Sequence, residues 1–408
     1  MTDCIVVCPD VKNEKYSRNG AARLEEASRL AESIDLNIIG KEIIKVAAIS
    51  PATFVSKGGI EKIRGSGLAD LLVMDCSLSP VQQRNLENVL NMKVIDRTAL
   101  ILEIFGRRAQ TKEGVLQVEL AHLTYQRSRL VRSWTHLERQ KGGGGFLGGP
   151  GEKQVELDRR QIDDRITKIK KDLAKVKQTR NLHRRSRGKV PYPIVALVGY
   201  TNAGKSTLFN YLTSSNVFAK DQLFATLDPT MRELKLPHGT KIILSDTVGF
   251  ISDLPHSLIA AFSATLEEVV NADVILHVRD IANPDSEAQK NDVNRVLKEL
   301  DVKKTPLEVM NKIDLLSAGD MVPLGAIGVS ALTGYGCDDL LKAIEDELTG
   351  GQNDCFIKLP SYQGSKIAWL YRNGTVISKK ALEDITEIHV RLTNENLNKW
   401  DALNDGKS

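Results

Sequence analysis

The chain has 408 residues, of which 41% are hydrophobic and 26% are charged, and its formal net charge is +4. This length predicts two or three domains with apolar cores, and the small net charge does not by itself indicate binding to nucleic acid. Five scattered cysteines without C-x-x-C spacing exclude a zinc site and a disulfide framework. The start of the chain does not have the pattern of a secretory signal, and the absence of any apolar run of about 18 residues excludes a membrane-spanning helix.

Residues 1–111 alternate between strand and helix signals. Strands are predicted at 5–7, 43–49, 71–74 and 94–95, and helices at 21–34, 54–63, 79–90 and 98–108. Such alternation is typical of a small α/β domain with a mostly parallel sheet. We find no set of residues in this domain that would perform catalysis.

Residues 112–189 have the pattern of two paired helices. Apolar side chains recur at steps of three, four or seven on either side of a glycine-rich segment at 142–151, with Arg127 at the skipped position of the first arm. They are Leu116, Leu120, Leu123, Leu130, Trp134 and Leu137, then Val155, Ile162, Ile166, Ile169, Leu173 and Val176. Because the glycine run is not expected to be helical, the pattern predicts an antiparallel hairpin with arms of roughly 25 residues, each about 40 Å long.

The second arm concentrates the positive charge of the chain. Residues 152–189 contain fourteen Lys or Arg and six Asp or Glu, a net charge of +8, which leaves the rest of the chain at −4. A long glycine-rich tip between basic side chains favours insertion into a groove of a large anionic partner, and a flexible connector is the alternative. For any single basic residue, a solvated helix face is the simpler interpretation.

Residues 190–350 are organised around a phosphate-binding loop. Residues 199–206 read Gly-Tyr-Thr-Asn-Ala-Gly-Lys-Ser, which is the G-x-x-x-x-G-K-S pattern, between an apolar strand at 194–198 and a helix start. The glycines let backbone N–H groups turn toward phosphates at a helix N-terminus. We expect Lys205 to reach the β- and γ-phosphates and Ser206 to hold Mg²⁺.

A doubly wound α/β domain surrounds this loop. Further strands are predicted at 242–244, 274–278, 307–310 and 326–329, and helices at 257–270, 285–300 and 337–348. The ligand of such a domain lies at the carboxyl ends of the strands. Asp246-Thr-Val-Gly249 occupies one such end, so we expect Asp246 to hold Mg²⁺ through water and the Gly249 N–H to sense the γ-phosphate.

Two further motifs indicate guanine rather than adenine. In Asn311-Lys-Ile-Asp314, the two carboxylate oxygens of Asp314 match the N1–H and N2–H₂ donors of guanine, which adenine lacks. Asn311 would tie the base edge to the phosphate loop, and the stem of Lys312 would cover the base face. In Ser330-Ala331-Leu332, the Ala331 N–H is available to guanine O6.

Residues 224–230 are expected to act as a switch. A threonine hydroxyl is needed for Mg²⁺, and Thr226 is the first choice, with Thr230 second. Phe250 stands where many GTPases have a glutamine that orients water, so another group must do so, and we expect slow intrinsic turnover. Asn202 either helps to hold a monovalent cation such as K⁺ or stabilises the loop itself.

The candidate site is defined by these motifs. The expected catalytic residues are Lys205, Thr226 and Gly249, and the expected Mg²⁺ ligands are Ser206, Thr226 and Asp246. The residues expected to contact the nucleotide are Gly199, Tyr200, Thr201, Asn202, Ala203, Gly204, Lys205, Ser206, Thr207, Phe224, Ala225, Thr226, Leu227, Asp228, Asp246, Thr247, Val248, Gly249, Asn311, Lys312, Ile313, Asp314, Ser330, Ala331 and Leu332.

Residues 351–408 are predicted to form a small tail domain. A strand at 355–359, a helix at 365–372 and strands at 375–378 and 385–392 give a β-α-β-β unit to which we assign no chemistry. The expected fold is α/β: a P-loop GTPase domain (190–350), preceded by a small α/β domain (1–111) with a long antiparallel helical hairpin (112–189), and followed by a small α+β tail domain (351–408).

The motifs resemble those of the HflX family of translational GTPases. The resemblance extends over residues 5–350 and rests on segments that begin at Arg97 (Arg-Thr-Ala-Leu-Ile-Leu), Leu116 (Leu-Gln-Val-Glu-Leu-Ala), His136 (His-Leu-Glu-Arg-Gln), Gly149 (Gly-Pro-Gly-Glu), Val198, Leu223, Asp246 and Leu254. At the hairpin tip, the chain reads Gly-Gly-Phe-Leu-Gly where the family more commonly has Gly-Gly-Ile-Gly-x-Arg.

The resemblance implies a cytoplasmic GTPase, and we leave peripheral membrane association open. It implies that the N-terminal region and hairpin dock on the large (50S) ribosomal subunit, and that the protein dissociates ribosomes, notably stalled ones after stress. It also implies stimulation by the ribosome, ATP use in some members, and potassium dependence in the wider class that has the Asn202 asparagine.

Two other hypotheses remain open at this point. One is a GTPase in assembly of the large subunit, and the other is a nucleotide-gated RNA-binding protein whose hydrolysis is incidental. Asp314 argues against functional ATP use, and we expect a monomer.

Overall fold

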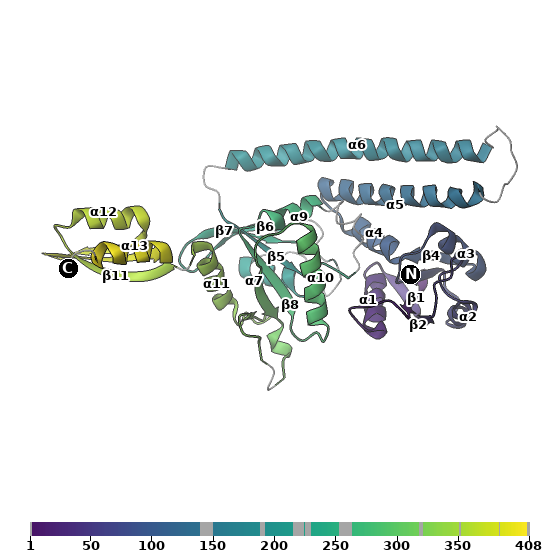
Figure 1. The fold of residues 1–408 in the computed structure, drawn as a ribbon, viewed down its shortest axis with the longest axis horizontal. Coiled ribbons are helices and arrows are strands. Elements are labelled where there is room, and N and C mark those ends of the chain that lie inside the picture. The colour runs from purple at the N-terminus through teal and green to yellow at the C-terminus, as the bar shows by residue number, and fades with distance from the viewer. Residues whose placement is uncertain are drawn as a thin grey trace.

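The computed structural model describes residues 2–138, 150–187, 192–214, 224, 230–252, 263–317, 321–350, 352–382 and 384–405. It shows an N-terminal α/β unit, a long helical hairpin, a central α/β unit and a C-terminal α+β unit at the far end of the molecule (Figure 1). The α/β fold class expected from the sequence is therefore confirmed.

The N-terminal unit is a parallel sheet between two pairs of helices. Its strands are β1 (Thr2–Val11), β2 (Leu36–Val46), β3 (Leu71–Met74) and β4 (Lys93–Asp96), in the order β2-β1-β3-β4. Helices α1 (Gly20–Glu32) and α4 (Arg97–Arg108) share one apolar core with the sheet, whereas α2 (Lys57–Gly65) and α3 (Pro80–Leu90) share another. Side chains of β1 alternate between the two cores, as strand geometry requires.

Strand β2 starts seven residues before the predicted strand at 43–49 and ends three residues earlier. Its first residues alternate between exposed and half-buried, because β2 lies at the edge of the sheet. The polar residues among them hid the strand from a search for apolar runs.

The hairpin consists of α5 (Lys112–Glu138) and α6 (Pro150–Arg187), which lie side by side (Figure 1). The ion pairs of Arg127 with Asp163 (2.9 Å) and of Arg165 with Glu119 (2.6 Å between Nε and Oε1) join the two helices. Arg129 of α5 donates to Asp96 and to the Leu78 carbonyl, which fixes the hairpin to the N-terminal sheet.

Helix α6 is longer than predicted, with 38 residues or about 57 Å. The apolar seam ends at Val176, but Lys, Arg and Gln residues have high helix propensity and continue the helix to Arg187. The tip was also set too long, because Pro150 and Gly151 open α6, where a proline at the first helical position is well tolerated. Tip residues 139–149 lie outside the described residues.

The central unit is a six-stranded sheet in the order β10-β9-β8-β5-β7-β6. Its strands are β5 (Ile194–Gly199), β6 (Thr230–Lys235), β7 (Lys241–Asp246), β8 (Val274–Asp280), β9 (Leu307–Asn311) and β10 (Ile327–Gly328), and its helices are α7 (Lys205–Thr213), α9 (Ser263–Val270), α10 (Ser286–Glu299) and α11 (Cys337–Thr349). All neighbouring strands are parallel except β6, which is antiparallel to β7. We did not predict β6, a polar edge strand.

The C-terminal unit contains β11 (Gln352–Pro360), α12 (Gly364–Asn373), β12 (Thr375–Ala381), β13 (Ile385–Thr393) and α13 (Asn394–Asp405). The strands form an antiparallel sheet in the order β11-β13-β12. Helix α13 was missed, although its buried Trp400 packs with Leu370 of α12 in the core of this unit.

Candidate functional site

The phosphate-binding loop joins β5 to α7. Gly199 has φ +154°, and a Cβ there would lie 2.2 Å from the carbonyl oxygen of Val278. Gly204 is the N-cap of α7 and has φ +89°, and a Cβ there would lie 2.1 Å from Asn311 Nδ2. Both positions therefore require glycine, and the close wrapping leaves backbone N–H groups around the N-terminus of α7, where phosphate binds favourably.

Lys205 lies inside this loop and is 5% exposed. Its Nζ donates to the carbonyl oxygens of Gly199 at 3.1 Å and Tyr200 at 2.8 Å. Burial lowers the pKa of Lys205 to about 8, although the negative charge of Asp246 acts in the opposite direction. A bound phosphate, like the negative charge of Asp246, would favour the charged form of Lys205, so nucleotide binding and protonation of Lys205 are coupled.

Ser206 and Asp246 bring two oxygen ligands together beside the loop. Ser206 Oγ donates to Asp246 Oδ2 at 2.7 Å, and Asp246 is fully buried at the end of β7. Hydroxyl and carboxylate oxygens are donors that Mg²⁺ prefers, and this ion is usually held by one or two such groups together with substrate phosphates. The residues present therefore fit Mg²⁺. In the described part of the chain, no cluster of three or more His, Cys, Asp or Glu side chains forms another metal site.

Asn311 connects the phosphate loop to the loop that follows β10. Its Nδ2 donates to the carbonyl oxygen of Ala203 at 2.9 Å, and its Oδ1 accepts the Ala331 N–H at 3.0 Å. The sequence predicts that this Ala331 N–H donates to guanine O6. The structure instead pairs it with Asn311, because the amide oxygen of a side chain only 2% exposed needs a donor.

Lys312 and Asp314 directly follow β9 at its carboxyl end. Lys312 has φ +65°, and its Nζ forms an ion pair with Asp280 Oδ2 at 2.7 Å, at the end of β8. Asp314 lies in a 3₁₀ turn at Ile313–Leu315, and its side chain is exposed. On the neighbouring loop, Ser330 is buried and Leu332 is 78% exposed.

Gly249 lies directly against the phosphate loop. A Cβ there would be 2.8 Å from Thr201 Cγ2 and 3.1 Å from Lys205 Nζ. The Thr201 N–H donates to the Phe250 carbonyl oxygen at 2.7 Å, which holds this segment beside the loop. Thr247 serves the sheet instead, since its Oγ1 donates to the Leu197 carbonyl at 2.6 Å. Asn202 and Thr207 lie in the loop and on α7 respectively.

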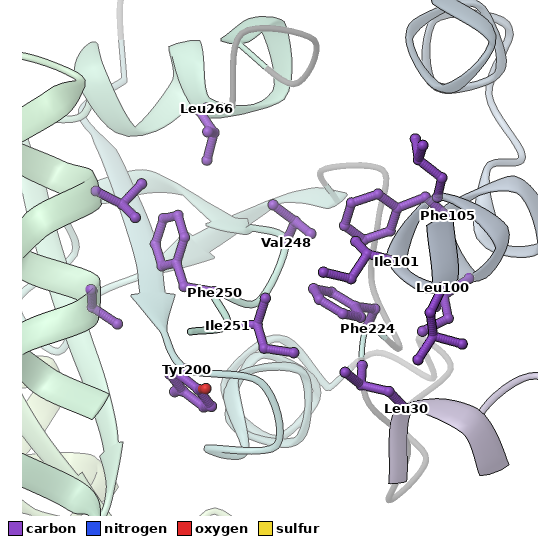
Figure 2. Close-up of a cluster of buried hydrophobic side chains, with 14 of the residues drawn as sticks. Leu30, Leu100, Ile101, Phe105, Tyr200, Phe224, Val248, Phe250, Ile251 and Leu266 are labelled. Carbon is purple, nitrogen blue, oxygen red and sulfur yellow. The ribbon is translucent and has the colours of Figure 1, made fainter. Parts of the chain in front are cut away.

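Three side chains expected at the nucleotide belong instead to an apolar cluster shared with the N-terminal unit: Tyr200, Phe224 and Val248. Figure 2 shows Phe224 and Val248 facing the α4 side chains Ile101 and Phe105, with Leu30 of α1 beside Phe224, and Tyr200 on the far side of Ile251. The rings of Phe224 and Phe105 meet edge to face, with centroids 4.7 Å apart. Burial of aromatic rings explains this placement, and only the backbones of these residues remain candidates for nucleotide contact.

A buried network of charges adjoins this cluster. Glu26 accepts from Arg18 (2.6 Å), from Arg97 and from Ser252 Oγ (2.9 Å), and Tyr200 donates to it. Burial alone would raise the pKa of Glu26, but Arg97 and Arg18 lower it to about 2. The Tyr200 hydroxyl also accepts the Ser252 N–H at 2.8 Å. The network thus joins the N-terminal unit to the phosphate loop and to the segment after Gly249.

We did not predict this network from the sequence. The six residues from Arg97 contributed to the family resemblance, but nothing local shows that Arg97 meets Glu26 and Ser252. Expected site residues that lie outside the described residues are Ala225, Thr226, Leu227 and Asp228. Thr230, the second choice for Mg²⁺, begins β6 and pairs with Asp246 of β7.

The doubly wound sheet and the loop at the end of β5, together with Asp246 and the Asn311–Asp314 motif at the ends of neighbouring strands, define a P-loop GTPase. Four family models match the chain: "GTP-binding GTPase N-terminal" at residues 21–106, "GTP-binding GTPase Middle Region" at 108–187, "50S ribosome-binding GTPase" at 194–312 and "HflX C-terminal domain" at 323–403.

Curated proteins with similar sequences agree with the family models. The chain is 48% identical to the GTPase HflX of Magnetococcus marinus over 93% of this chain and 90% of that protein. It is 48% identical to the GTPase HflX of Escherichia coli over 77% of this chain and 76% of that protein. A GTP-binding protein of Sulfolobus solfataricus, solved with GDP, is similar with a TM-score of 0.45 and 23% identity, covering 86% of this chain and 99% of that chain.

The chain therefore belongs to the HflX family of GTPases, binds GTP and GDP in its GTPase domain, and hydrolyses GTP. No helix within the described ranges is long and apolar enough to cross a bilayer.

Proposed function

We propose that this GTPase binds the large ribosomal subunit in its GTP form and dissociates ribosomes, notably stalled ones. The observation that carries the proposal is a long cationic hairpin, fixed to the N-terminal sheet, in the same chain as a GTPase domain. We also propose that the chain is a cytoplasmic monomer, built from units at 1–111, 112–189, 190–350 and 351–408.

The exposed face of α6 supports an anionic partner. Ile166 and Ile169 are buried, so Lys168, Lys171 and Lys175, which follow helical spacing, lie on the opposite side of the helix and are exposed. Lys168 and Lys171 form no ion pair with any described residue. These two lysines lie about one helical turn apart along the arm, and such a spacing of cations suits contact with the phosphates of RNA.

In the nucleotide site, we assign phosphate binding to Lys205 and to the backbone N–H groups of residues 199–206. Ser206 and Asp246 would hold Mg²⁺, with Thr226 as the third ligand; when bound, this ion neutralises charge that develops on the phosphates. We also propose that the Gly249 N–H contacts the γ-phosphate; the closeness of Gly249 to Lys205 supports this, since a Cβ at Gly249 would lie 3.1 Å from Lys205 Nζ. Asp314 would select guanine.

Phe250 does not position the attacking water, because its side chain is only 1% exposed and lies in the apolar cluster (Figure 2). We therefore propose slow intrinsic hydrolysis that the ribosome stimulates. Asn202 is half-buried with φ +62° and lines a cavity of about 460 Å³ beside the loop. We propose that it helps to hold K⁺ near the phosphates.

Binding to the subunit can be tested by co-sedimentation with purified large ribosomal subunits, using a non-hydrolysable GTP analogue. Replacing Lys168 and Lys171 by alanine should weaken binding and lower the slope of log affinity against log salt by about 2, one for each lost phosphate contact. The matched control replaces the exposed Lys298 and Lys303 of the GTPase domain. Equal binding by both double variants would remove the hairpin from the proposal.

A further inference from the structure

The sheet of the C-terminal unit has one covered and one open face. Ile388, Val390 and Leu392 of β13 are buried with Leu370 and Trp400 from the two helices. Because side chains alternate along a strand, residues 387, 389 and 391 lie on the opposite face. Cross-strand pairing places Phe356 and Lys358 of β11 on that same face, beside His389 and Glu387.

An aromatic pair stands at the centre of this open face. The rings of Phe356 and His389 are stacked, with centroids 4.2 Å apart and planes 11° apart. Phe356 is nevertheless 78% exposed. One ring of the pair is therefore held in place by its neighbour while most of its surface is presented to solvent. Exposure of a phenyl ring to water is unfavourable in free energy, and a planar group stacked on the ring would remove this exposed apolar surface.

The charged residues around the rings form rows with an excess of cations. Lys358 pairs with Glu387 at 2.7 Å, and Arg391 pairs with Asp354 at 2.7 Å, so each carboxylate of these rows already has a cation. Lys380 of β12 lies opposite Glu387 across the sheet and forms no ion pair within 4 Å among the described residues. The three cations and two carboxylates leave the face weakly positive.

We propose that this face binds single-stranded RNA, with an unpaired base stacked on Phe356 and the backbone phosphates beside Lys358 and Lys380. Sheets that present an aromatic ring to unstacked bases, with cations along the backbone path, are a general solution for single strands. A protein partner fits less well, because a single ring pair between rows of ion pairs is not a contiguous apolar patch. The site is separate from the hairpin and does not depend on its proposed role.

The test uses the full-length chain and a 4-thiouridine-containing RNA strand of about ten nucleotides, within the range of known single-strand sites. Photo-crosslinked peptides are mapped by mass spectrometry, which separates the sheet from any binding by the hairpin. Phe356→Ala should lower the crosslink yield at β11 and β13 about tenfold, since stacking on one ring contributes that order of affinity. Phe356→Trp should retain crosslinking, and so should Tyr362→Ala, the control, which removes an exposed ring (85%) of the same unit outside the strands.

Two further measurements distinguish stacking of an unpaired base from general attraction to RNA. A duplex of the same length should not crosslink to the sheet, because its bases are already stacked. Lys380→Ala should lower the salt slope of binding at this site by about 0.7, the value for one phosphate contact of a single strand. The proposal is overturned if crosslinks are confined to the hairpin, if Phe356→Ala crosslinks like the wild type, or if the duplex crosslinks equally well.

Discussion

Replacing Arg97 by alanine tests the buried network most severely. Arg97 is 7% exposed and contacts Glu26, Asp75 and both the carbonyl and hydroxyl oxygens of Ser252. Its removal leaves Glu26 (8% exposed) with Arg18 alone and Asp75 (4% exposed) with Arg23 alone, at 3.7 Å, so the buried negative charge is only partly compensated. Removing one partner of a buried ion pair typically destabilises a protein by about 3–5 kcal/mol, and we expect a loss in this range for the N-terminal unit.

The same helix provides the control. Arg107 pairs with Asp35 at 3.1 Å, but these side chains are 53% and 75% exposed. Solvent screening limits such a surface pair to about 0–1 kcal/mol, so Arg107→Ala should be nearly neutral. Urea unfolding followed by circular dichroism compares the two variants with the wild type. If Arg97→Ala is no more destabilising than Arg107→Ala, the reasoning about the buried network is refuted.

Three other predictions concern protons and the phosphate loop. The pKa of Lys205 is lowered to about 8 and bound phosphate favours the charged form, so GDP binding at pH 9 should take up close to one proton. For the same reason, the affinity for GDP should fall as the pH rises above 8. Calorimetry in buffers of different ionisation enthalpy measures the proton uptake, and the absence of uptake at pH 9 would contradict this prediction. Gly204→Ala should weaken binding of a fluorescent GDP analogue by at least about tenfold, because the new Cβ would meet Asn311 Nδ2 at 2.1 Å in a left-handed backbone; unchanged affinity would contradict this. The pKa of Glu26 is lowered to about 2 from 4.5, so its stabilisation, of the order of 3 kcal/mol, is present above pH 4.5 and lost as the pH falls toward 2; Glu26→Gln should lose that part of the acid dependence of unfolding.

The elements that local sequence determines were the most predictable. The loop at 199–206 and the end of β9 at Asn311 are short motifs whose glycines and polar side chains must stand next to a strand, so their positions followed from the pattern. The apolar seam likewise predicted the pairing of α5 with α6. Local signals were weaker for the polar edge strands β2 and β6, which bury few side chains and lack an apolar run.

The contacts between units could not be predicted in this way. Tyr200 appeared only as a member of the phosphate loop, but its ring packs between units and its hydroxyl bonds to Glu26, 174 residues away. Phe224 likewise was expected at the nucleotide, but its ring packs on Phe105. Such placements depend on which buried surfaces meet in three dimensions, and no spacing along the chain records them. The available signal was the presence of charged residues, among them Arg97 and Glu26, on helix faces that also carry the apolar residues of the core.

GTP turnover with and without purified large ribosomal subunits is the most direct test of the proposed function. We predict slow hydrolysis by the protein alone, because Phe250 is buried and no glutamine follows Gly249, and strong stimulation when the subunits are added. Turnover that stays slow with saturating subunits, without co-sedimentation in the presence of a GTP analogue, would contradict a ribosomal role and leave a GTPase with a different partner.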